Sequence, residues 1–189
     1  WMDSQTVLIA SLRCQPLVVV LRPGPEDLVE PFSNKPFFSL IEQLHFEGVQ
    51  HIEIAWSSHP GWMALIKYLR SNFSNVSLGA ASINNSSALK AVAELGLQYA
   101  MTPLWNLSLQ QEAQKLGQLL IPGVFSPTEI HQATSLGCRL IKLFPSSTLG
   151  IKYIHHLKGP IDSLPFIIAA GGLTVNDLSP WLEEGYGAI

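Results

Sequence analysis

The sequence predicts a single (β/α)8 barrel, because short apolar runs recur along its 189 residues and stretches with helical spacing separate them. Runs that are apolar on both faces suit parallel strands that helices cover, not a half-exposed antiparallel sheet. Successive runs lie about 20 to 30 residues apart, as β-then-α units require. The runs expected to form strands are 17–21, 49–55, 76–81, 98–102, 119–124, 139–144 and 165–170.

Helical spacing is clearest after the third run, where Ala88, Leu89 and Val92 lie on one apolar stripe. Two later helical stretches end near Gly117 and Gly137, the residue type that commonly terminates a helix. The segments expected to form helices are 3–14, 86–95, 106–116 and 127–136, and Thr174 with Asp177 marks a further helix start of the capping-box kind.

An eighth unit begins at residues 185–189, where the sequence stops. Seven units and a cut eighth favour a barrel with a truncated eighth unit over an open doubly wound sheet. No linker or change in composition divides residues 1–189, so we expect one domain. The long first connection, 23–36, is expected to form a loop at the rim.

Composition and charge argue against a nucleic-acid-binding or membrane protein. Hydrophobic residues make up 47% of the chain, and 11 Lys and Arg against 14 Asp and Glu give a net charge of −3. Mild acidity without a basic run argues against nucleic-acid or membrane-surface partners, and no apolar run approaches the length of a membrane span. With no signal peptide recognised, we expect a cytoplasmic protein.

The cysteines, histidines and tryptophans give further expectations. Cys14 and Cys138 are expected to be reduced, buried thiols, and the six scattered histidines predict no metal site. Trp62 and Trp105 are candidates for exposed interface residues, although core or rim packing suits them equally.

In barrels of this kind the chemistry sits at the C-terminal ends of the strands. In the sixth run, alternation directs Leu140, Lys142 and Phe144 into the barrel and Ile141 with Leu143 outward. An interior lysine is costly unless it has a role or a partner. Lys142 is therefore either a nucleophilic amine, kept neutral by burial, or a structural lysine neutralised by a carboxylate.

The second run supplies that carboxylate. Alternation places His51 and Glu53 on its inner face, which makes Glu53 the expected neighbour of Lys142. The pair is either an inert ion pair or a nucleophile with a general acid and base. His51 lies deeper and is interpreted as a hydrogen-bonded core histidine.

Two further strand ends carry possible anion-binding groups. Arg22 follows the first strand and either grips a carboxylate or phosphate or pairs with Glu26 or Asp27 at the surface. Gly171 and Gly172 precede the expected helix start at Thr174, where backbone N–H groups suit a phosphate. Ser82, Thr102 and Pro103 also lie at strand ends but are individually weak signals.

Together these residues resemble the family of 2-keto-3-deoxy-6-phosphogluconate and 4-hydroxy-2-oxoglutarate (KDPG/KHG) aldolases. The most specific motif is 141–145, Ile-Lys-Leu-Phe-Pro, which is similar to the Schiff-base segment of that family. Residues 48–54 resemble the strand with its catalytic glutamate, and the likeness extends from about residue 16 to the end.

The resemblance implies a class I aldolase in which Lys142 forms the imine, Glu53 moves protons and Arg22 grips the carboxylate of a 2-keto acid. It also implies a homotrimer and a reaction that needs no cofactor, because the imine is formed on the protein itself. The residues expected to bind substrate are Arg22, Ser82, Thr102, Pro103, Phe144, Pro145, Gly171 and Gly172.

Several positions depart from the family pattern. Ala81 stands where the family often has glycine, Ala170 where it often has threonine, and Ser147 where it commonly has glutamate. Some members carry an arginine at the position of Ser57, so Arg22 would act alone. These changes spare the Lys142–Glu53 chemistry but leave the preferred substrate open.

The expected products are pyruvate and an aldehyde, either glyceraldehyde 3-phosphate or glyoxylate. One alternative is a barrel that binds pyruvate or a sugar phosphate without turnover. Another is a different phosphate-binding barrel enzyme, such as an isomerase or epimerase, which would leave Lys142 facing Glu53 without a specific purpose.

Overall fold

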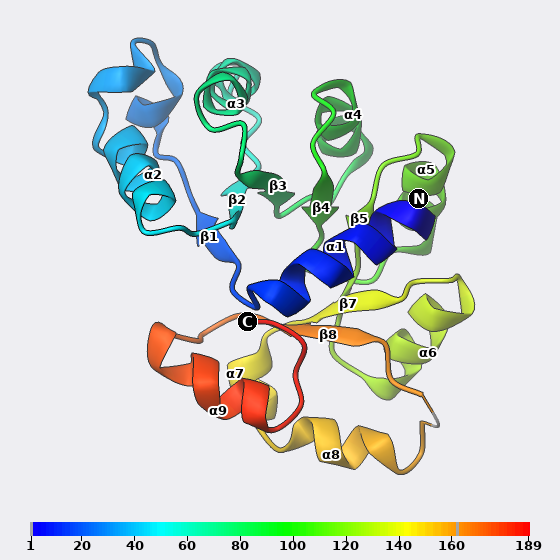
Figure 1. Cartoon of the computed structure of the whole chain (residues 1–189). Helices are drawn as coiled ribbons and strands as arrows, with labels where there is room; N and C mark the ends of the chain where they lie inside the picture. The colour runs from blue at the N-terminus through cyan, green and yellow to red at the C-terminus, as the bar shows by residue number, and fades with distance from the viewer. Residues whose placement is uncertain (1, 162) are drawn as a thin grey trace.

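The computed structural model describes residues 2–161 and 163–189 and confirms an α/β fold of parallel strands with helices on the outside (Figure 1). The strands are β1 (Val19–Leu21), β2 (His51–Ala55), β3 (Ser77–Ala81), β4 (Tyr99–Met101), β5 (Leu120–Ile121), β6 (Gly123–Val124), β7 (Leu140–Leu143) and β8 (Phe166–Ala169). The helices are α1 (Met2–Cys14), α2 (Pro36–Phe46), α3 (Gly61–Asn72), α4 (Ser86–Glu94), α5 (Leu107–Lys115), α6 (Pro127–Ser135), α7 (Ser146–Leu149), α8 (Tyr153–Lys158) and α9 (Leu178–Glu183). Short 3₁₀ turns occupy Pro25–Leu28, Phe32–Asn34 and Val175–Asp177.

The strands form two parallel sheets, β1 to β5 and β6 to β8, in sequence order. Pro122 separates β5 from β6, and it has no N–H with which to continue the ladder. Its carbonyl still accepts a hydrogen bond from the Lys142 amide at 2.9 Å, so β5 and β6 act as two halves of one strand of the ring.

Because β5 and β6 count as one strand, β8 is the seventh strand of the ring. Residues 187–189, which follow α9, begin the eighth and close the ring. The Ala169 amide donates to the carbonyl of Ala188 at 2.9 Å. On the other side, the Ile189 amide donates to Pro16 at 3.0 Å and the Val18 amide donates to Ile189 at 2.8 Å. The start of the eighth unit therefore lies between β8 and the segment that leads into β1.

Side-chain alternation divides the core into an outer and an inner part. On β7, Ile141 and Leu143 pack outward with the helices, while Leu140 joins the interior cluster. Helix α1 crosses one end of the ring (Figure 1) and adds Leu8 and Leu12 to that interior cluster. The other end, where the strands finish, is left to the loops that carry the expected site residues.

The expectation that both cysteines are buried is wrong for one of them. Cys14 is exposed, because it ends α1 at the edge of the barrel, whereas Cys138 is buried and its burial raises the pKa of the thiol to about 12. For Trp62 the structure selects core packing, one of the two alternatives left open by the sequence: it is fully buried in the outer core and donates a hydrogen bond to the Ala55 carbonyl at 2.9 Å. Within the described residues, no helix combines the length and apolar character needed to cross a membrane.

Candidate active site

Lys142 lies inside the barrel, as alternation predicts. It belongs to β7, the middle strand of its sheet, and its side chain is only 7% exposed. Its Nζ atom lies 5.4 Å from the centre of the Phe144 ring, a distance at which the π face attracts a cation. A lysine in this apolar setting is shielded from water and held at one place on a rigid strand.

Glu53 is completely buried on β2. Neither carboxylate oxygen has a hydrogen-bond partner among the residues that the structure describes. Burial disfavours the charged form and raises the pKa of Glu53 to about 7, although the positive charge of Lys142 acts in the opposite direction. A carboxyl group with a pKa near neutrality can both give and accept protons, which is what a general acid and base requires.

Lys142 and Glu53 are neighbours but not a closed ion pair. The charge of Lys142 lowers the pKa of Glu53, yet no contact within 4.0 Å joins the two groups in the described part of the chain. The inert ion pair that the sequence left possible is therefore not formed.

Arg22 lies exposed at the rim, beyond the end of β1. Its Nη1 atom donates to the Ser82 hydroxyl at 3.3 Å, and Ser82 holds a positive φ of 64°, which is uncommon for a residue other than glycine. The described residues show no pairing of Arg22 with Glu26 or Asp27; the Asp27 carboxylate accepts from the Gly24 amide instead. Ser82 thus binds the Arg22 guanidinium at the rim of the barrel.

Thr102 and Pro103 shape the loop after β4. The Thr102 hydroxyl donates to the Leu104 carbonyl at 3.1 Å and accepts from the Leu104 amide at 3.3 Å. A Cβ atom on Gly123 would lie 2.4 Å from the carbonyl carbon of Pro103, so the loop after β4 packs directly on the start of β6. The structure therefore gives the Thr102 hydroxyl a role within its own turn, and substrate contact by Thr102 stays a prediction.

Phe144, Pro145 and the Gly171–Gly172 segment form one packed wall. A Cβ atom on Gly171 would come within 2.8 Å of the Phe144 ring and 3.1 Å of the Pro145 Cα. On Gly172 it would lie 2.3 Å from the Ser147 hydroxyl. Both glycines also have positive φ angles, 91° and 72°, so conformation and close packing each require glycine there.

Ser146 is a site residue that the sequence interpretation missed. It is fully buried, its hydroxyl donates to the Leu143 carbonyl at 2.7 Å, and it accepts from the Ala170 amide at 3.1 Å. These bonds tie the loop after Lys142 to the end of β8. A serine directly after a strand and a proline is a recognisable turn signal, but its partner on β8 is not visible in sequence.

The expected helix start after the glycines is confirmed. The Asp177 carboxylate accepts from the Thr174 amide at 2.7 Å and from its hydroxyl at 2.9 Å, and these bonds lower the pKa of Asp177. A carboxylate already occupies the start of this short turn. A phosphate there would therefore depend on the backbone of Gly171 and Gly172, and its binding stays a prediction.

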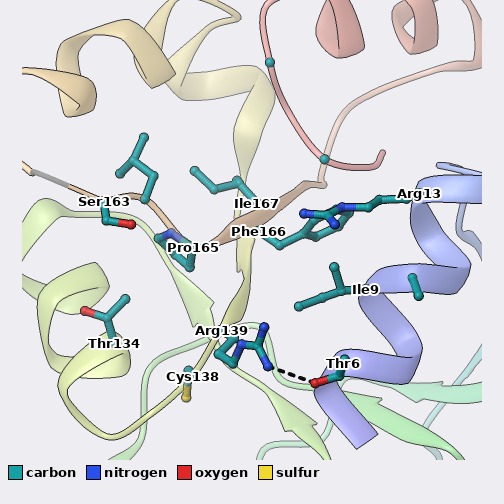
Figure 2. Close-up of a pocket in the computed structure, with 14 residues that line it drawn as sticks. Thr6, Ile9, Arg13, Thr134, Cys138, Arg139, Ser163, Pro165, Phe166 and Ile167 are labelled. Carbon is teal, nitrogen blue, oxygen red and sulfur yellow. Dashed lines mark hydrogen bonds between the residues drawn. The ribbon is translucent and has the colours of Figure 1, made fainter. Parts of the chain in front are cut away.

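Two pockets of the described structure lie apart from Lys142 and Glu53. One of about 710 Å³ lies at the end of the barrel that α1 covers, and Figure 2 shows Arg13, Arg139 and Phe166 among its lining residues. A smaller one of about 310 Å³ lies near Arg22 and includes Ser57 and His59. Lys142 and Glu53 line neither pocket, because both side chains are buried in the interior of the barrel.

Comparison with known proteins points to one family. The family model described as KDPG and KHG aldolase matches residues 28–189. Over 139 residues the chain is 30% identical to 2-dehydro-3-deoxy-6-phosphogalactonate aldolase of Escherichia coli K12, covering 73% of this chain and 67% of that protein. Over 137 residues it is 26% identical to 2-dehydro-3-deoxy-phosphogluconate aldolase of Pseudoalteromonas atlantica, covering 72% and 63% of the two proteins.

Solved structures agree on the fold. A native KDPGal structure superposes with a TM-score of 0.76 at 26% identity, covering 92% of this chain and 80% of that one. KDPG aldolase of Legionella pneumophila, with pyruvate captured as a covalent carbinolamine, gives a TM-score of 0.78 at 20% identity and covers 95% and 84% of the two chains.

Proposed function

Because the chain belongs to the KDPG and KHG aldolase family, we propose that it is a class I aldolase that releases pyruvate from a 2-keto acid. The substrate is of the 2-keto-3-deoxy-6-phosphogluconate or 4-hydroxy-2-oxoglutarate type, and the second product is glyceraldehyde 3-phosphate or glyoxylate. The observation that carries this proposal is the buried Lys142 beside Glu53, a carboxyl group with its pKa raised to about 7.

Imine formation is the first stage. After Lys142 has lost a proton to the Glu53 carboxylate, its Nζ lone pair attacks the ketone carbon. The C=O π electrons move to oxygen, and a proton passes from the attacking nitrogen to that oxygen to give a neutral carbinolamine. Protonated Glu53 then gives its proton to that hydroxyl, water leaves, and the nitrogen lone pair completes a protonated imine. A pKa of about 7 keeps a large share of Glu53 protonated for this step at neutral pH.

Cleavage follows from the same two groups. The Glu53 carboxylate removes the proton of the hydroxyl on carbon 4, the bond between carbons 3 and 4 breaks, and its electron pair moves into the protonated imine. The aldehyde leaves and an enamine stays on Lys142. Protonated Glu53 returns a proton to carbon 3, and hydrolysis of the imine releases pyruvate and restores the amine.

We propose that residues at the rim and in the packed wall bind the substrate. Arg22, oriented by Ser82, is proposed to hold the substrate carboxylate through parallel hydrogen bonds. Phe144 and Pro145 limit the space beside Lys142, and the backbone of Gly171 and Gly172 is proposed to receive a phosphate where the substrate has one. No separate cofactor is required, because the imine on Lys142 supplies the electron sink.

Cell location and assembly complete the proposal. We propose a cytoplasmic homotrimer of carbohydrate metabolism that acts on small molecules and not on nucleic acid. The resemblance to the family supports the trimer, and Leu104, Leu107 and Phe125 are large apolar side chains at least 42% exposed that an interface could cover.

The test measures pyruvate release from each substrate type through a coupled dehydrogenase assay. Wild-type protein should turn over at least one substrate, Lys142→Ala should abolish turnover and Glu53→Gln should slow it severely. Lys67→Ala, which removes an exposed lysine of α3, is the matched control and should keep the wild-type rate. Near-normal rates in both Lys142→Ala and Glu53→Gln would sink the proposal, and imine formation without aldehyde release would favour a non-catalytic binding barrel.

A further inference from the structure

Tyr99 brings a buried hydroxyl into the barrel interior beside Glu53. The residue is fully buried on β4, and its hydroxyl has no hydrogen-bond partner among the described residues. In the parallel register Glu53 pairs with Gly79, and Gly79 pairs with Tyr99. The three residues therefore lie at one level on three adjacent strands.

Gly79 lets the phenol ring cross β3. A Cβ atom on Gly79 would lie 2.5 Å from both Cε2 and Cζ of Tyr99, so the ring occupies the space in front of that glycine. Because Cζ carries the hydroxyl, the oxygen extends past β3 in the direction of β2. Burial raises the pKa of Tyr99, and the charge of Glu53 raises it further, as expected for two groups that lie close together.

Other groups around Glu53 leave the carboxylate without a donor. His51 on the same strand is bound through Nε2 to the Ser11 hydroxyl at 3.2 Å, and burial lowers the pKa of its ring. Lys142 faces Glu53 from β7 but lies beyond ion-pair distance, and Arg22 is turned to Ser82 at the rim. The remaining interior side chains that the structure describes on β5, β7 and β8 are apolar, namely Ile121, Leu140 and Ile168.

We propose that Tyr99 is a positioning residue for Glu53, whose ionised carboxylate accepts a hydrogen bond from the phenol directly or through one water molecule. Such a bond holds the carboxylate in one orientation and stabilises its charged form. The phenol stays protonated throughout the neutral range, so it can act as a donor whenever Glu53 loses its proton. The catalytic consequence rests on the proposed function, whereas the pairing itself does not.

The test measures the pKa of Glu53 directly, by ¹³C NMR titration of side-chain-labelled glutamate, with Glu53→Gln to assign the signal. Tyr99→Phe keeps the ring and removes only the hydroxyl, and it should raise the pKa of Glu53 by about one unit, the shift expected for loss of one hydrogen bond to a charged group. The matched control is Tyr68→Phe, since Tyr68 packs outside the barrel against Phe32 and Phe38. This control should leave the pKa of Glu53 unchanged.

A second variant guards against a folding defect in Tyr99→Phe. Placing 3-fluorotyrosine at position 99 keeps the hydroxyl and makes it a stronger donor, so the pKa of Glu53 should fall. An unchanged pKa of Glu53 in both variants would overturn the inference. Because the titration needs no substrate, a shift in a protein without aldolase activity would retain this inference and reject only the proposed function.

Turnover supplies a readout that a purely structural role would not move. If Glu53 must be ionised for carbon–carbon cleavage, the acidic limb of the kcat profile should shift upward in Tyr99→Phe by the same amount as the pKa of Glu53. KM for the substrate should change little, because Tyr99 lies below the rim and binds Glu53 instead of the substrate. A uniform loss of rate at every pH would contradict the positioning role.

Discussion

Replacing Glu53 by glutamine is expected to stabilise the folded protein above neutral pH, although it removes the proposed proton carrier. The reason is the setting of the carboxylate, which is completely buried and has no hydrogen-bond partner among the described residues. Ionisation there is unfavourable even with Lys142 nearby, and burial raises the pKa of Glu53 from 4.5 to about 7.

The sign and size follow from proton linkage. Because the folded pKa lies above the unfolded one, the folded state binds this proton more tightly, and stability falls as the pH rises from 4.5 to about 7. At about 1.4 kcal/mol per pKa unit, the difference between 4.5 and about 7 corresponds to an upper value of about 3.5 kcal/mol. The attraction of Lys142 is already contained in this shift, whereas a hydrogen bond from Tyr99 to the carboxylate is not and would make the effect smaller.

Chemical denaturation at pH 5 and at pH 8.5 measures the effect. At pH 8.5 the free energy of unfolding of Glu53→Gln should exceed that of wild type by up to about 3.5 kcal/mol, whereas at pH 5 the difference should stay below about 1 kcal/mol. Glu42→Gln, at an exposed position of α2, is the control and should follow wild type. Equal pH dependence in wild type and Glu53→Gln would refute the reasoning, because Glu53 would then titrate alike in both states.

Three further substitutions test the surrounding geometry. Arg22→Lys should raise KM for the keto acid about tenfold or more, with a smaller effect on kcat, since one ammonium group cannot form two parallel hydrogen bonds to a carboxylate. Steady-state kinetics measures KM and kcat. Gly171→Ala should lower both stability and activity, because the added Cβ lies 2.8 Å from the Phe144 ring and the backbone has a φ of 91°. The control is Gly117→Ala, where φ is 69° but the space is open, and it should lower stability alone. Ser146→Ala removes a buried hydroxyl that joins β7 to β8 and should cost about 1–3 kcal/mol in chemical denaturation.

Side-chain alternation made the interior pair predictable. On a buried parallel strand the outward residues must pack on helices, so the apolar Ile141 and Leu143 fix the direction of Lys142 between them. The same rule directs Glu53 inward from β2, between Ile52 and Ile54 of the outer core. The alternation of side chains along each strand was therefore sufficient to predict that Lys142 and Glu53 point into the barrel, without knowledge of the tertiary contacts.

Features that depend on register were not predictable in this way. Tyr99 is one more apolar residue within its run, and its hydroxyl gains meaning only because Gly79 stands between it and Glu53. Likewise, Arg22 had several possible partners in sequence, and only the fold brings Ser82 to it. The prediction that Cys14 is buried failed for a related reason. Which face of α1 is exposed depends on how this helix packs across the end of the barrel, and the sequence does not show that.

The central claim, that Lys142 forms an imine with a 2-keto acid, is tested most directly by borohydride reduction with and without pyruvate, followed by intact-mass and peptide mapping. The account predicts a pyruvate-sized adduct on Lys142 that requires both pyruvate and borohydride and that is absent from Lys142→Ala. If well-folded protein gives no adduct, or carries it on a lysine other than Lys142, the account is contradicted at its first chemical step.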